Sequence, residues 1–266
     1  MKGPDGERKV GYGDVVSVSG SVTPRIAGAT VRLEHAGRGG GFRPLMRTRT
    51  GPDGSYRFAV KARRSGTYRA VVVAAASEAH HVTVVGALSA RAKRHVLGGR
   101  GVGVRGTLLP RVSGRAVRLE LATYGGWRGV GRARTGGGGR FHVRWRPRGA
   151  GVYRLRVRSA GDRFAAASAE RLARIYSYRA GHASWYGPGL YGNPLGCGGT
   201  LSPGTLGVAH KYLPCGTKVT FRYRGRSATV PVLDRGPFVA GREWDLTAAT
   251  KQKLGFGSTG TVWSTR

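Results

Sequence analysis

One aspartate and one histidine near the C-terminus have the residue types and the setting for acid–base chemistry. Asp234 follows an apolar run in ATVPVLDRGPF, residues 228–238, so that an Asp-Arg-Gly-Pro turn closes a predicted strand. His210 lies 24 residues earlier, in the segment AHKYLP. Residues 180–266 hold only three carboxylates and two histidines. Any acid–base mechanism in this region must therefore use members of this short set.

The same side chains also have structural interpretations. Asp234 could be a turn residue that accepts a hydrogen bond from the Gly236 backbone, and His210 could be a buried imidazole satisfied by the main chain. Asp245 is expected to cap a short helix rather than to act as a second acid.

The two cysteines indicate an oxidising environment. Cys197 and Cys215 are the only cysteines of the chain, and 17 residues separate them. A disulfide closing this loop would stabilise the fold by roughly 3 kcal/mol in the chain-entropy estimate. A zinc site needs more ligands at tighter spacing, so we expect a disulfide and no metal centre. Disulfides persist in extracytoplasmic compartments, which favours a secreted or cell-envelope protein.

Positive charge extends along the whole chain. The formal net charge is +34, divided into +27 for residues 1–179 and +7 for residues 180–266. Such a surface attracts polyanions, among them anionic polymers of a bacterial wall, although an arginine-rich genome composition would give the same excess. No helix-turn-helix or aromatic-basic platform predicts specific nucleic-acid binding.

The sequence gives two observations about export. No run of 18 apolar residues predicts a transmembrane helix. The first residues, MKGPDGERKV, lack the apolar core of a signal peptide. For a secreted protein we therefore expect that an exported precursor was trimmed or that the true start lies upstream.

The first two thirds of the chain contain an internal repeat of 85 to 86 residues. The segment VRLE at residues 31–34 recurs at residues 117–120, and GTYR at residues 66–69 is answered by GVYR at residues 151–154. Apolar and polar residues alternate within each copy, and Gly, Pro and Asp turns separate the runs. This pattern predicts two immunoglobulin-like β-sandwiches, over residues 10–86 and 93–177. We expect them to be a structural stalk or a spacer and adhesive module.

Local patterns also predict the elements that flank the candidate site. Residues 219–223 and 228–232 alternate around an Arg-Gly-Arg turn, which predicts a β-hairpin that places Asp234 on its inward face. A short helix that ends at Gly255 is expected, with Asp245 or Thr247 as its N-cap. The Ala-rich segment 164–178 could pass for a helix, but the repeat register predicts a strand over residues 171–176.

The last third resembles a known family in four ordered motifs. These are ASWYG at residues 183–187, AHKYLPCGTKV at 209–219, DRGPF at 234–238 and the DLT-to-LGF segment at 245–256. Together they resemble the double-psi β-barrel of the rare lipoprotein A family, septal-ring lytic transglycosylases of the bacterial envelope, and more remotely the barrel of expansins. Two departures from the family pattern are the acid-free loop at residues 196–202 and Leu233, where Asn is common.

The resemblance implies a fold and an activity. The fold class is all-β, with two immunoglobulin-like sandwiches followed by a six-stranded double-psi β-barrel over residues 180–266. The implied reaction is cleavage of the peptidoglycan bond between N-acetylmuramic acid and N-acetylglucosamine with a 1,6-anhydro product and no cofactor. Asp234 is the implied catalytic acid/base, and His210 is its neighbour. The implied substrate-binding residues are Trp185, Tyr186, Arg235, Phe238 and Trp244, whose aromatic members could instead fill the barrel core.

The scarcity of carboxylates bears on the type of reaction. A hydrolase usually needs a second carboxylate as base or nucleophile. In a lytic transglycosylase the muramyl C6 hydroxyl attacks its own anomeric carbon, so one group can serve as acid and then as base. The alternative is an expansin-like protein that binds and loosens wall glycans without cutting them. A third possibility is a secreted protein whose basic sandwiches hold it on anionic wall polymers.

Overall fold

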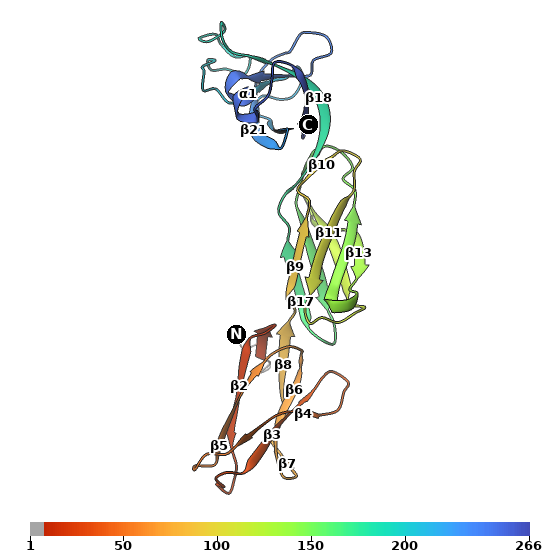
Figure 1. Ribbon diagram of the computed structural model, residues 1–266, viewed down its shortest axis with the longest axis vertical. Coiled ribbons are helices and arrows are strands. Elements are labelled where there is room, and N and C mark those ends of the chain that lie inside the picture. The colour runs from red at the N-terminus through yellow and green to blue at the C-terminus, as the bar shows by residue number, and fades with distance from the viewer. Residues whose placement is uncertain (1–7) are drawn as a thin grey trace. The chain divides into compact units, whose positions relative to one another are not determined.

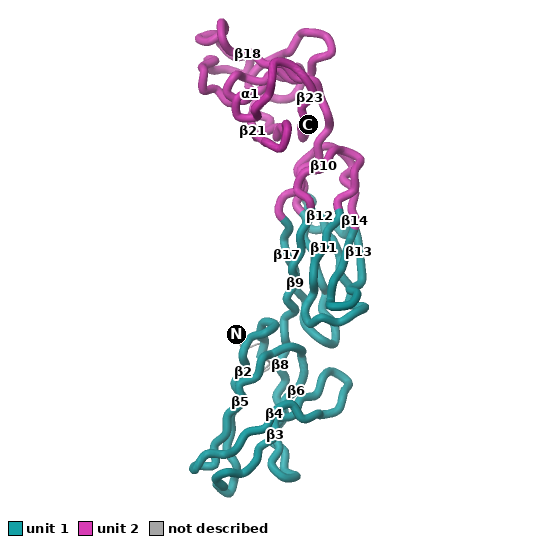
Figure 2. The backbone as a smooth tube through the Cα atoms, in the orientation of Figure 1, with its two compact units in different colours: residues 1–92, 103–143, 155–172 teal, residues 93–102, 144–154, 173–266 magenta. Residues whose placement is uncertain are grey.

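The computed structural model describes residues 8–266, and these residues form mainly β-strands (Figure 1). They group into two compact units, shown in Figure 2. One unit holds the described residues up to 92 with residues 103–143 and 155–172, and the other holds residues 93–102, 144–154 and 173–266. The three domain ranges expected from the sequence therefore stay predictions.

The first sandwich consists of eight strands in two facing sheets. The larger sheet has the order β8-β6-β3-β4, with β1 pairing β8 and β7 pairing β6, and the second sheet is the β2–β5 pair. Val16, Leu33, Phe58 and Val84, one from each of four strands of the two sheets, are buried in the shared core. The strands are β1 (Arg8–Gly11), β2 (Val15–Ser21), β3 (Thr30–Ala36), β4 (Arg43–Arg49), β5 (Ser55–Lys61), β6 (Gly66–Val72), β7 (Ala75–Ala76) and β8 (His80–Val85).

The second sandwich repeats this plan, as the sequence period predicts. The strands β13-β12-β16-β17 continue the larger sheet of the first sandwich, because Ala166 of β17 pairs with Val85 of β8, and the second sheet has the order β14-β11-β9. The strands are β9 (Leu88–Ala92), β11 (Val102–Leu108), β12 (Ala116–Thr123), β13 (Gly126–Arg134), β14 (Arg140–Trp145), β16 (Leu155–Gly161) and β17 (Ala166–Arg171), with a 3-10 turn η1 (Gly137–Gly139) before β14. Two short strands of this region, β10 (His95–Leu97) and β15 (Gly151–Tyr153), pair instead with β18 (Ile175–Tyr186).

The repeat extends to single interactions but contains a slip. A β-bulge directly precedes Glu34 in β3 and Glu120 in β12. Glu34 pairs with Arg69 at 2.9 Å, and Glu120 pairs with Arg156 at 2.6 Å. The repeat in the sequence equates Arg69 with Arg154, which lies two residues before the observed partner Arg156. The register differs because the strand that is continuous in the first copy is divided into β15 and β16 in the second.

A closed barrel of six strands follows. Its order is β18-β22-β19-β21-β20-β23, and β23 pairs back with β18. The pairs β18–β22 and β19–β21 are parallel, and the other four are antiparallel. The remaining strands are β19 (Val208–Ala209), β20 (Lys218–Tyr223), β21 (Arg226–Asp234), β22 (Trp244–Thr247) and β23 (Gly260–Ser264). The predicted all-β class, with two sandwiches before a six-stranded barrel, is confirmed.

The elements around the candidate site largely match their predictions. β20 and β21 form the expected hairpin, and its turn residues Arg224 and Gly225 both have positive φ. The helix α1 (Ala248–Leu254) ends at Gly255 in the left-handed conformation. Thr247, not Asp245, caps its N-terminus by accepting a hydrogen bond from the Thr250 amide. The Ala-rich segment forms strands, but β17 ends at Arg171 and β18 begins at Ile175, so the predicted strand over 171–176 is displaced.

Candidate active site

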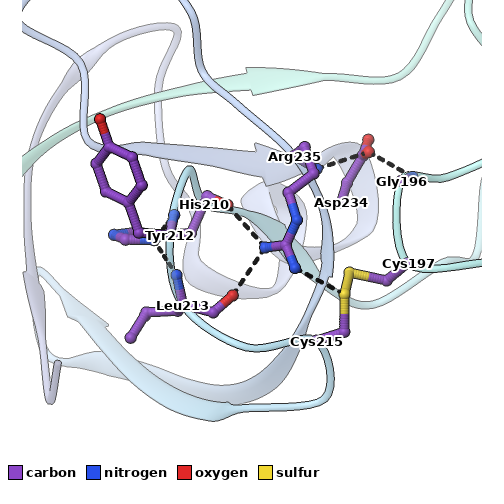
Figure 3. Close-up of a disulfide and its surroundings, with 8 residues drawn as sticks. All are labelled: Gly196, Cys197, His210, Tyr212, Leu213, Cys215, Asp234 and Arg235. Atoms are coloured by element: carbon purple, nitrogen blue, oxygen red, sulfur yellow. Dashed lines mark hydrogen bonds between the residues drawn. A yellow bond between two sulfur atoms is a disulfide. The ribbon is translucent and has the colours of Figure 1, made fainter.

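Asp234 ends strand β21, and its carboxylate is fixed from one side. Oδ1 accepts hydrogen bonds from the amides of Gly196 and Arg235, both at 2.8 Å (Figure 3). The turn interpretation of Asp234 required a hydrogen bond from the Gly236 amide to its side chain. Within residues 8–266 this hydrogen bond does not occur. The side chain is half-buried, and both of these backbone donors bind the same oxygen, Oδ1.

Asp245 lies across strand β19 from Asp234. Ala209 of β19 pairs with Asp234 on one side and with Asp245 on the other. Two strand spacings put the Cα atoms of the two aspartates roughly 10 Å apart, and the pairing of Ala209 with Asp234 follows a register shift in β19. Oδ1 of Asp245 accepts a hydrogen bond from the Ser184 hydroxyl at 2.8 Å. The sequence interpretation of Asp245 as a helix cap is thus wrong.

The environment of Asp245 favours its protonated form. Burial raises the pKa of this carboxyl, and the charge of Asp234 raises it further. The Ser184 hydrogen bond and Arg242 lower the pKa, but burial outweighs them. A carboxylic acid that keeps its proton beyond the usual range of Asp is suited to donate it.

The third carboxylate of the barrel is engaged elsewhere. Glu243 forms a two-pronged ion pair with Arg179, in which Nη1 donates to Oε2 at 2.7 Å and Nη2 donates to Oε1. This fork holds both oxygens of Glu243. Asp234 and Asp245 are therefore the two acids of residues 180–266 that no ion pair holds.

His210 is held as a neutral ring by its own loop. Nδ1 accepts hydrogen bonds from the amides of Tyr212, at 3.1 Å, and Leu213, at 3.0 Å. Because Nδ1 accepts, the proton of the neutral ring is on Nε2. Burial lowers the pKa of His210, and the cations Arg179, Arg235 and Lys211 lower it further.

Asp234 and the His210 ring make no direct hydrogen bond in the described part of the chain. The His210 amide donates instead to the Asp234 carbonyl at 3.1 Å. The loop thus fixes the strand end, while the ring presents Nε2–H as a donor.

Arg235 ties this loop to the disulfide. Its Nη1 donates to the carbonyls of His210 and Leu213, and its Nη2 lies 2.9 Å from Sγ of Cys215 (Figure 3). The sequence predicts Arg235 as a substrate-binding residue. Two of its nitrogens are instead used to hold the protein around Asp234.

The Cys197–Cys215 disulfide predicted from the sequence is present. Gly196, whose amide binds Asp234, directly precedes Cys197, and the Cys197 amide donates to the Leu233 carbonyl. A Cβ atom at Gly196 would lie 2.9 Å from Cγ of Arg235 and 3.0 Å from Oδ1 of Asp234. Only glycine lets this loop approach the carboxylate so closely.

The predicted aromatic residues divide between core and surface. Trp244 is 0% exposed and fills the barrel core, so it offers no face to a sugar. The centroid of its ring lies 4.6 Å from that of the His210 ring. Trp185 packs at the edge of the core with Nζ of Lys251 over its ring at 3.6 Å. Phe238 is 82% exposed, and Tyr212, which the sequence analysis did not single out as a binding residue, is 86% exposed.

Tyr186 lies beside both aspartates. Its hydroxyl is buried and has no hydrogen-bond partner among the described residues that meets ordinary geometry. Burial raises the pKa of Tyr186, and the charge of Asp234, the approach of the phenol to that carboxylate and the charge of Asp245 raise it further. The phenol therefore stays neutral and can donate a hydrogen bond.

Two classes of site are not found in the described residues. Residues 8–266 contain no group of three or more His, Cys, Asp or Glu side chains placed to hold a metal ion. Among the helices of the same residues, none has the length and apolar character that crossing a membrane requires.

Comparison with known proteins supports the resemblance seen in the motifs. Residues 178–263 match the family model described as lytic transglycolase. The "Probable endolytic peptidoglycan transglycosylase RlpA" of Synechocystis sp. is 42% identical over 90 residues, which cover 33% of this chain and 28% of that protein. The endolytic peptidoglycan transglycosylase RlpA of Campylobacter jejuni is 43% identical over 84 residues, 31% of this chain and 30% of that protein.

The similarity to these relatives is confined to the barrel. The chain covers less than a third of the length of either protein, and the matched residues are the last third of this chain. The two sandwiches lie outside the matched region.

Proposed function

We propose that the barrel is a lytic transglycosylase that cleaves peptidoglycan between N-acetylmuramic acid and N-acetylglucosamine. One observation carries the proposal: two carboxylates that no ion pair holds lie on either side of Ala209 in a barrel that matches the lytic transglycolase family. The names of the relatives add support, since they are called endolytic peptidoglycan transglycosylases.

The reaction needs one proton given and one proton removed. An acid protonates the glycosidic oxygen as its bond to C1 of N-acetylmuramic acid breaks. The C6 hydroxyl of the same sugar then attacks C1 and loses its proton to a base, which leaves a 1,6-anhydro ring and consumes no water.

The two aspartates can share these steps. Asp245, whose pKa burial raises, is proposed as the proton donor. Asp234, held through Oδ1, is proposed to receive the C6 proton on Oδ2. This assignment divides between two residues the work that the sequence-based hypothesis gave to Asp234 alone, and each positioned group is expected to contribute roughly 10²–10⁴-fold in rate.

Three further side chains are proposed to hold the substrate. Nε2–H of His210 and the neutral phenol of Tyr186 are donors for sugar oxygens or developing charge. The exposed ring of Phe238, four residues after Asp234, is proposed to pack on a sugar face.

The protein is proposed to act in a bacterial cell envelope. The disulfide requires an oxidising compartment for its formation, and peptidoglycan lies in such a compartment. The sandwiches are proposed to space the barrel from its attachment or to hold it near anionic polymers.

Product analysis tests the proposal. The full chain is incubated with purified peptidoglycan in ¹⁸O-water, and the fragments are examined by mass spectrometry. Anhydro ends without ¹⁸O are expected. Reducing ends that carry ¹⁸O would show hydrolysis, and intact glycan with preserved binding would leave the expansin-like alternative.

Variants of the two acids test the assignment. Asp234→Asn and Asp245→Asn should each lose at least about 10²-fold in rate while still binding glycan. The matched control is Glu78→Gln, which alters an exposed carboxylate of the first sandwich. Full activity of Asp245→Asn would return both proton transfers to Asp234.

A further inference from the structure

A second pocket lies at the end of the β20–β21 hairpin remote from Asp234. Its volume is about 870 Å³, and its lining comes from residues 93–97, 100–101, 222–225, 261 and 263. The strand β21 runs from Arg226 to Asp234, so the pocket and the proposed active site are separated by roughly 26 Å along this strand. The pocket is thus a different site.

Backbone pairing builds one wall of this pocket. β10 (His95–Leu97) pairs in parallel with residues 176–178 of β18, as Figure 1 shows near the start of β18. The Tyr176 amide donates to the Arg94 carbonyl at 2.6 Å, and the Gly98 amide donates to the Tyr178 carbonyl at 2.5 Å. All of these residues belong to the same compact unit as the barrel (Figure 2).

The charges around the pocket all have one sign. Its lining contains no carboxylate and five cationic side chains, which are Lys93, Arg94, Arg100, Arg222 and Arg224. None of these five forms an ion pair within residues 8–266, whereas Glu34, Glu120, Asp162 and Glu243 each pair with an arginine elsewhere. Unpaired like charges around one cavity repel one another and attract an anion.

Aromatic side chains lie among the cations of this pocket. Nδ1 of His95 lies 2.8 Å from the Tyr178 hydroxyl, and the Tyr178 ring contacts that of Trp263 with centroids 6.0 Å apart. Arg94, His95 and Arg222 line the pocket together, and burial lowers the pKa of His95, with the charges of Arg222 and Arg94 as further causes. Trp263 is half-buried and lines the pocket.

We propose that this pocket binds an anionic glycopolymer whose sugar or polyol units are joined by phosphodiesters. Guanidinium groups match phosphate oxygens in forked hydrogen bonds, and the Trp263 ring suits the carbon face of a saccharide or polyol. Single-stranded nucleic acid is bound along grooves with successive exposed aromatic platforms. A concave pocket with two half-buried rings, Tyr223 and Trp263, fits one or two saccharide units instead.

Titration of the full chain with a short poly(glycerol phosphate) oligomer tests the site. Arg94→Gln/Arg222→Gln should bind at least about tenfold more weakly. The slope of log affinity against log salt concentration should be smaller in magnitude by roughly one to two for this variant, because each lost phosphate contact reduces the slope by about one. The matched control, Arg47→Gln/Arg57→Gln, removes the same charge from exposed positions of the first sandwich and should stay within about twofold of wild type. Equal losses in the two variants would overturn the proposal.

Competing ligands and a second variant complete the test. Three ligands are compared with the phosphodiester oligomer: a neutral chitooligosaccharide, and an oligogalacturonate and an oligothymidylate that each carry the same charge as that oligomer. All three should bind less tightly. Equal or tighter binding of the galacturonate or the thymidylate would overturn the assigned ligand. Should the first variant fail to fold, Lys93→Gln/Arg100→Gln changes two exposed side chains and carries the same expectation.

Discussion

Breaking the Cys197–Cys215 bridge is expected to destabilise the barrel and to free the loop that holds Asp234. The bridge closes a sequence separation of 18 residues, for which the chain-entropy estimate is roughly 3 kcal/mol. In a domain of about 90 residues each kcal/mol lowers Tm by about 4–8 °C, so the barrel transition should fall by roughly 12–24 °C.

Calorimetry of the full chain carrying Cys197→Ser/Cys215→Ser measures this shift. The sandwiches contain no cysteine, so their unfolding is an internal reference. Hydrogen exchange should show the Gly196 amide losing protection, because its hydrogen bond to Asp234 depends on the position of this loop. Glycan cleavage should fall together with that protection.

The result that refutes this reasoning is specific. A barrel transition within about 2 °C of wild type, with the Gly196 amide still protected, would show that the loop is held without the bridge. A reducing agent should shift the wild-type transition and leave that of the double variant unchanged. A shift in the double variant would point to an effect unrelated to the disulfide.

Two other predictions concern His210 and Gly207. The pKa of His210 is lowered from its ordinary value of 6.5, so on acidification the unfolded chain binds a proton before the folded ring does. The free energy of unfolding should therefore fall as pH drops below about 6.5. Urea unfolding at pH 7.5 and 5.5 should show a smaller loss of stability for His210→Gln than for the wild type, and an identical loss would contradict the prediction. A Cβ at Gly207 would lie 1.8 Å from Cδ2 of Leu233, so Gly207→Ala should lower the free energy of unfolding by about 1–3 kcal/mol, while Gly204→Ala, with nothing within 4 Å, should stay within about 0.5 kcal/mol of wild type by urea titration.

Local sequence patterns determined much of the fold. Period-2 alternation and the Arg224-Gly225 turn predict the β20–β21 hairpin, because strand faces and turn conformations depend on neighbouring residues. The repeat predicts two similar sandwiches, and the cysteine pair predicts the disulfide. The four motifs locate the barrel and direct attention to Asp234 and His210.

The tertiary structure decided which side chains share a site. Asp245 and Asp234 meet because both pair with Ala209, and pairing across strands is a non-local property that short patterns do not encode. Trp244, which precedes the Asp-Leu-Thr segment, illustrates the same limit. From the sequence it could bind a sugar or fill the core, and only the closed barrel buries it. Likewise, the sequence places residues 93–101 at the start of the second repeat, and only the pairing of β10 with β18 brings Arg94 and Arg222 into one pocket. Sequence periodicity thus fixed faces and turns, whereas register and barrel closure, which depend on contacts between distant residues, assembled the sites.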